Sequence, residues 1–124
     1  NPEQPVDSLA LVGGLEIGCL AGVALAAASH RVPVVLDGFI TTAAALVASR
    51  LELELPHYLI ASHRSVEPGH QIQLETLGLE PILDLDLRLG EGTGAALGMG
   101  LVEASVKLLG QMATFAEAKV SGQL

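Results

Sequence analysis

Residues 31–65 read RVPVVLDGFITTAAALVASRLELELPHYLIASHRS and predict a strand, a helix and a second strand. Residues 31–36 are short and rich in β-branched side chains, which is typical of a strand buried on both faces. A helix with an apolar side is expected over residues 39–51, and residues 57–61 form the next apolar run. Because strand, helix and strand in this order make a right-handed crossover, we expect the two strands to be parallel.

The same alternation continues on both sides of this unit. A buried helix is expected over Leu15 to Ser29, where only small residues interrupt the apolar run. Downstream, a further helix ends at Gly78, and residues 81–87 alternate apolar and acidic side chains as a third strand. A glycine-rich turn then leads into a long Ala/Leu helix that ends near Gln111. The fold class is therefore α/β and Rossmann-like, with a parallel sheet of about three strands and helices on both faces.

We divide the chain into three parts. Residues 1–12 are expected to be a connector, because they are mostly polar at the start and contain two prolines. Residues 13–111 form the α/β part, and residues 112–124 form a tail with a short helix around Ala113 to Ala118. The chain opens with Asn1 and has 124 residues, which is short for an enzyme with two substrates, so we expect upstream sequence.

The composition narrows the class of protein. A net charge of −8 would repel a polyanion, so nucleic acid is not an expected partner. The apolar run from Leu9 to Ala28 contains Glu16 and four glycines, which favours a buried helix in a soluble protein over a membrane span. The single cysteine, Cys19, is expected to be buried and leaves no disulfide within the chain, which favours the cytoplasm.

Polar residues follow each of the three predicted strands. They are Asp37-Gly38 after the first strand, residues 62–65 after the second and residues 88–91 after the third. Ligands of parallel α/β sheets bind beyond the carboxyl ends of the strands. We therefore expect a ligand site at this edge of the sheet.

The third strand end holds a carboxylate, Glu91, between Gly90 and Gly92. The glycines loosely match a dinucleotide-binding turn, but no strand follows the next helix to supply the acidic residue that such binding needs. On the residues alone, a tight turn in which the glycines have a purely structural role is an alternative of equal weight. A carboxylate with glycines on both sides is nevertheless open to approach, which suits a general base.

The second strand end reads SHRS at residues 62–65 and favours an anion, because hydroxyl groups surround Arg64. A metal is not expected, since Pro68-Gly69 interrupts the spacing between His63 and His70. The two histidines are instead expected to be hydrogen-bonding loop residues.

Asp37, at the first strand end, can either bind a ligand hydroxyl or cap the backbone N–H groups of a helix. Both interpretations of Asp37 stay open.

Five motifs occur in one order along the chain: VGGLEI at 12–17, VVLDGFI at 34–40, YLIASHRS at 58–65, EPGH at 67–70 and LRLGEGTGA at 87–95. Together they resemble the nicotinate-nucleotide:dimethylbenzimidazole phosphoribosyltransferase family, and the likeness extends to ATFAEA at 113–118. Members of that family are longer, with a large α/β domain and a small domain assembled from both termini. The chain is similar to their C-terminal third, with its tail joining the small domain.

The resemblance implies a pentosyltransferase of cobalamin biosynthesis, with no cofactor. Phosphoribosyl would pass from nicotinate mononucleotide to 5,6-dimethylbenzimidazole with inversion, giving α-ribazole 5'-phosphate and nicotinate. A homodimer is expected, and the activity of the chain by itself is left open. A non-catalytic nucleotide-binding or dimerisation module is the alternative. By resemblance, Glu91 is the general base, Leu89 lines the benzimidazole pocket, Gly90 and Gly92 approach the nucleotide, Ser65 lies near the phosphate, and Asp37 and Gly38 lie near the ribose and nicotinate.

Overall fold

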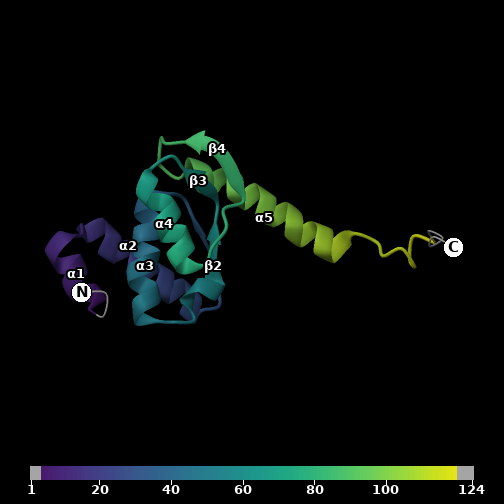
Figure 1. Ribbon diagram of the computed structural model, residues 1–124. Helices are drawn as coiled ribbons and strands as arrows, with labels where there is room; N and C mark the ends of the chain where they lie inside the picture. The colour runs from purple at the N-terminus through teal and green to yellow at the C-terminus, as the bar shows by residue number, and fades with distance from the viewer. Residues whose placement is uncertain (1–3, 120–124) are drawn as a thin grey trace.

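The computed structural model describes residues 4–119 and confirms the α/β class (Figure 1). Its helices and strands are, in chain order, α1 (Pro5–Val12), α2 (Leu15–Ser29), β1 (Val34–Leu36), α3 (Phe39–Leu51), the 3-10 helix η1 (Leu55–Tyr58), β2 (Leu59–Ala61), β3 (His63–Ser65), α4 (Pro68–Leu77), β4 (Leu83–Leu87) and α5 (Thr93–Gln111). Within the described residues, no helix is both long and apolar enough to cross a bilayer.

The strands form two parallel pairs. In the first pair, β1 lies beside β2 with Val34 opposite Leu59; in the second, β3 lies beside β4 with His63 opposite Leu83. Only Ser62 separates β2 from β3, and the N–H of Ser62 donates to the carbonyl of Leu36 at 3.0 Å. The carbonyl of Ser62 in turn accepts the N–H of Leu83 at 3.0 Å. The segment from β2 to β3 is therefore the middle of three adjacent segments, in agreement with the expected sheet of about three strands.

Helices cover both faces of this sheet. The core lies on the face of α2 and α3, where alanines allow the two helices to approach closely. Its buried members are Ala21, Ala24, Leu36, Ala44, Ala45, Ala48, Leu55, Leu59 and Leu77. On the opposite face, α5 places Gly98 against Ser62 and Val35, which point away from that core because side chains alternate along a strand. The C-terminal half of α5 extends beyond the sheet, and its residues are largely exposed (Figure 1).

Two segments differ from the sequence prediction at the chain ends. The connector expected over residues 1–12 contains helix α1, which begins at Pro5. Proline lacks an N–H, but the first turn of a helix leaves its N–H groups without a helical partner anyway, so this proline starts a helix and does not prevent one. The short helix expected around Ala113 to Ala118 is absent, and residues 115–119 form turns.

The structure also corrects the prediction at several positions away from the chain ends. Pro68 and Gly69, expected as a turn, form the first turn of α4, and residues 63–65 of an expected loop form β3. Helix α2 has the expected bounds but buries only Ala21 and Ala24. Glu16 and Cys19, expected inside a buried helix, are both exposed because they lie on the other side of α2.

Candidate functional site

A cavity of about 530 Å³ lies at the carboxyl edge of the strands, where the β1–α3, β3–α4 and β4–α5 connections meet. Its lining residues are Asp37, Gly38, Phe39, Ile40, Thr41, His63, Ser65, Glu67, Arg88, Gly90, Glu91 and Gly92. The volume is in the range of small-molecule sites. Six of the seven residues predicted for the site line this cavity, and Leu89 does not. Leu89 is 72% exposed, and its contact with an aromatic base stays a prediction.

The turn that carries Glu91 has an unusual backbone. Gly90, Glu91 and Gly92 have φ values of 77°, 58° and 81°, so three successive residues are left-handed. Glycine adopts this conformation freely, whereas a residue with a Cβ does so at a cost of about 1–2 kcal/mol. Such strain persists only where surrounding structure imposes it, and it is concentrated at functional sites. The turn presents the exposed Glu91 at the cavity.

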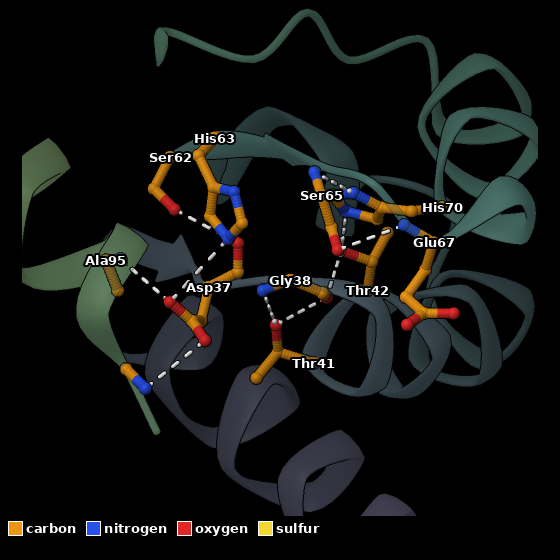
Figure 2. Close-up of polar contacts among 11 residues, drawn as sticks. Asp37, Gly38, Thr41, Thr42, Ser62, His63, Ser65, Glu67, His70 and Ala95 are labelled. Atoms are coloured by element: carbon orange, nitrogen blue, oxygen red, sulfur yellow. Dashed lines mark hydrogen bonds and ion pairs between the residues drawn. The ribbon is translucent and has the colours of Figure 1, made fainter. Parts of the chain in front are cut away.

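Asp37 ties this turn to the end of β1. Its Oδ2 accepts the N–H of Gly92 at 3.2 Å and its Oδ1 accepts the N–H of Ala95 at 3.0 Å (Figure 2). Helix α5 has Gly92 at its N-cap, which has no side chain to cap with, and Asp37 supplies the missing cap from a different element. Of the two interpretations left open by the sequence, the capping interaction is present, but on α5 and not on the helix that follows Asp37.

The start of α3 is capped within its own first turn. The N–H of Gly38 donates to Thr41 Oγ1 at 3.1 Å, and the Thr41 hydroxyl donates to the carbonyl of Gly38 at 2.9 Å. Thr42 adds a second donation to the same carbonyl at 2.8 Å. Asp37 is therefore not needed at α3, and its carboxylate is free to cap α5.

A buried hydrogen-bond chain connects the end of β3 to the start of α3. The N–H of Ser65 donates to Nδ1 of His70 at 3.0 Å, so the neutral ring carries its proton on Nε2. That nitrogen lies 2.9 Å from Thr42 Oγ1, which donates onward to the carbonyl of Gly38 (Figure 2). The expectation that His70 hydrogen-bonds is confirmed, although the residue belongs to α4 and not to a loop. The chain of hydrogen bonds fixes Ser65 and Gly38, two predicted site residues, relative to each other.

Burial lowers the pKa of His70 below its ordinary value of 6.5. The nearby His63 lowers it further, Asp37 opposes the shift, and Arg64 again lowers it. Because Nδ1 accepts a hydrogen bond, a proton placed there would face the N–H of Ser65. Burial and hydrogen bonding therefore both favour the neutral ring.

The lowered pKa predicts how stability depends on pH. Above pH 6.5 the His70 ring is neutral in both the folded and the unfolded chain, so its contribution to the free energy of unfolding is fully present. As the pH falls below 6.5 towards the folded-state pKa, the unfolded chain takes up a proton that the folded chain resists, and the free energy of unfolding decreases. When urea unfolding is measured from about pH 7.5 to about pH 5, the free energy of unfolding should decrease less in His70→Gln than in the unmodified protein. His30→Gln, at an exposed histidine, is the control; equal slopes for all three proteins would contradict the prediction.

The ring of His63 lies between the two helix starts of the site. It is 4% exposed, and a Cβ added at Gly38 would lie 3.3 Å from its Nε2, while one added at Gly94 would lie 2.6 Å from the same atom. Nε2 is 3.9 Å from Asp37 Oδ1, which is too long for a hydrogen bond. His63 is thus a packing element between β1, β3 and α5. Within the described residues, no group of three or more His, Cys, Asp or Glu side chains is arranged to hold a metal.

The comparisons with known proteins identify the family of the chain. A family model described as "Phosphoribosyltransferase" matches residues 1–120. The nicotinate-nucleotide–dimethylbenzimidazole phosphoribosyltransferase of Geobacter sp. (strain M21) is 62% identical over 121 residues. The chain belongs to this phosphoribosyltransferase family. The enzyme of the same name from Chloroflexus aggregans is 61% identical over 121 residues.

The fold of the chain also matches that of a solved phosphoribosyltransferase. A crystal structure of the Thermus thermophilus enzyme matches with a TM-score of 0.92 and 52% identity, and covers 96% of this chain and 36% of that one. The match to the Geobacter relative covers 98% of this chain and 35% of the relative. The chain therefore spans about a third of the length of the phosphoribosyltransferases that it matches.

Sequence reasoning did not identify Thr42 as part of the site. Thr42 is fully buried within the apolar helix α3, and a buried hydroxyl needs a hydrogen-bonding partner. That requirement was the available signal, but the partner, His70, lies 28 residues away. Local patterns do not specify such a pairing.

Proposed function

We propose that this chain is the C-terminal part of a nicotinate-nucleotide:dimethylbenzimidazole phosphoribosyltransferase, and that Glu91 is its general base. Family membership supports the reaction class. The observation that carries the assignment of Glu91 is its position on a left-handed turn at a cavity formed by three strand ends. The tail, predicted over residues 112–124 and described as far as residue 119, would join the small domain of the longer enzyme.

The proposed reaction exchanges one C–N bond for another. One nitrogen of 5,6-dimethylbenzimidazole attacks C1' of nicotinate mononucleotide, and the bond from C1' to the nicotinate nitrogen breaks. The bonding electrons leave with nicotinate, and C1' inverts. The second benzimidazole nitrogen becomes acidic as positive charge develops on the ring, and its proton passes to the carboxylate of Glu91. The products are α-ribazole 5'-phosphate and nicotinate.

The remaining predicted site residues would surround the bound substrates. Gly90 and Gly92 lack side chains, so the backbone beside Glu91 is open to a nucleotide. Ser65 also lines the cavity, and we propose that it contacts the phosphate and that Asp37 and Gly38 place the end of β1 near the ribose and nicotinate. Leu89 would contact the benzimidazole ring once the remaining part of the enzyme completes that pocket. No cofactor takes part in this proposal.

We further propose a homodimer that acts in the cytoplasm on small molecules and does not bind nucleic acid. The net charge of −8 supports the last point. Exposed apolar side chains at the end of α5 support a larger assembly, since Leu109 is 90% and Met112 70% exposed in this chain.

The test is product formation from nicotinate mononucleotide and dimethylbenzimidazole, measured for this chain by itself and for the longer enzyme. We expect turnover by the longer enzyme and none above background by the chain, because the chain spans only about a third of the length of its relatives. Calorimetry with the longer enzyme is the second measurement. Binding of adenine nucleotides, without binding of nicotinate mononucleotide or benzimidazoles, would refute the proposal in favour of a nucleotide-binding module.

A further inference from the structure

The turn at Glu91 needs an external restraint. Its left-handed φ of 58° is unfavourable for a residue with a side chain, and the flanking glycines add freedom. The local hydrogen bonds, from Thr93 to Gly90 at 3.3 Å and from Ala96 to Gly92 at 2.9 Å, lie within the turn and α5. They shape the turn but do not fix it relative to the sheet.

Asp37 supplies the link from this turn to another element. In the described part of the chain, its two oxygens make the side-chain hydrogen bonds that join residues 90–95 to the remainder of the site. The two accepted N–H groups, on Gly92 and Ala95, are three residues apart, so the carboxylate fixes the direction of α5 as well as its position. Glu91 directly precedes the first of them.

Asp37 is itself held rigidly. It follows Leu36, which is 4% exposed and paired within the sheet, and its carbonyl accepts the Ser62 hydroxyl at 3.1 Å. The side chain of Asp37 is 12% exposed, so water competes little with its two hydrogen bonds. A negative charge at a helix N-terminus also interacts favourably with the helix dipole. The restraint on the turn is therefore stiff and close to Glu91.

We propose that Asp37 is a positioning residue for catalysis, which acts by holding the Glu91 turn at the distance and angle that proton transfer requires. This inference rests on the proposed role of Glu91 as the base. It differs from the contact with a ligand hydroxyl that the sequence left open for Asp37, because both carboxylate oxygens are already engaged by the backbone of α5 and its N-cap. Figure 2 shows the two bonds spanning from the end of β1 to the start of α5.

The test uses Asp37→Asn in the longer enzyme. An amide keeps the shape of the side chain and one accepting oxygen, but its NH₂ group opposes the second backbone N–H. We expect kcat to decrease by about 10- to 100-fold, the scale of a misplacement of about 1 Å, with KM changed by less than roughly threefold. Asp86→Asn, the same change at an exposed aspartate of β4, should leave both constants unchanged.

Two further measurements separate positioning from a general structural role. Hydrogen exchange at the Gly92 and Ala95 amides should accelerate by at least about tenfold in Asp37→Asn, while exchange within α3 stays unchanged. In a Glu91→Gln background, Asp37→Asn should lower kcat by no more than roughly twofold, because residues that act as a unit are not additive. If Asp37→Asn does not fold, Asp37→Glu, which keeps the charge on a longer side chain, replaces it with the same expectations.

The outcomes are distinct. An unchanged kcat in Asp37→Asn, a raised KM with normal kcat, or a full additional loss in the Glu91→Gln background would each overturn the positioning role. Full turnover by Glu91→Gln alone would instead refute the proposed base. The exchange rates at Gly92 and Ala95 do not depend on turnover and would still report whether Asp37 holds the turn.

Discussion

Replacement of Glu91 by Gln in the longer enzyme is expected to lower kcat by about 10²- to 10⁴-fold, the usual contribution of a positioned general base. Glutamine has the same length and can adopt the same turn, but its amide does not accept the proton from the benzimidazole nitrogen. KM should change little, since the backbone around the cavity is retained. The measurement is steady-state formation of α-ribazole 5'-phosphate with both substrates varied.

Two further variants make this experiment more specific. Glu91→Asp keeps a proton acceptor but withdraws it by one methylene, so its kcat should lie between those of the unmodified enzyme and Glu91→Gln. Glu103→Gln, at an exposed glutamate in the middle of α5, should retain normal turnover. If Glu91→Gln also retains normal turnover, proton acceptance by Glu91 is wrong.

The meeting of the strand ends could be predicted because it depends on a general property of parallel sheets. Apolar runs followed by Asp37-Gly38, Ser65 and Glu91 place polar groups at one edge whatever the details of packing. The cavity lined by these residues follows from that rule. The bounds of α2, α3 and α5 were equally accessible, since helix periodicity and glycine turns are local signals.

The interactions that fix the site geometry were not accessible from the sequence. Asp37 caps a helix whose N-cap lies 55 residues downstream, and His70 joins Thr42 across 28 residues. An aspartate or a histidine has several possible partners, and the choice depends on how the helices and strands pack. Helix α1 was missed for a different reason, because Pro5 is compatible with both a connector and the first turn of a helix.

The glycine at position 94 illustrates how such packing constrains the sequence. In a helix, Gly→Ala normally stabilises by about 1 kcal/mol, so Gly94→Ala in α5 would be favourable if space were available. A Cβ at Gly94 would instead lie 2.6 Å from Nε2 of His63 and closer still to its Cδ2. The ring has little room to move, because it is 4% exposed and its other side approaches Gly38.

Gly94→Ala is therefore expected to destabilise the protein by about 3 kcal/mol, the scale of overpacking in a rigid core, and to reduce turnover because the start of α5 carries the Glu91 turn. Gly100→Ala, at an exposed position of α5 where the new Cβ meets nothing within 4 Å beyond the adjacent backbone of its own helix, is the matched control and should be neutral or stabilising. Urea unfolding of the longer enzyme measures the free energy of unfolding of both variants. In a His63→Ala background the added methyl has space, so Gly94→Ala should then cost less than about 1 kcal/mol. An equal cost in both backgrounds would mean that the imidazole of His63 is not what requires glycine at this position.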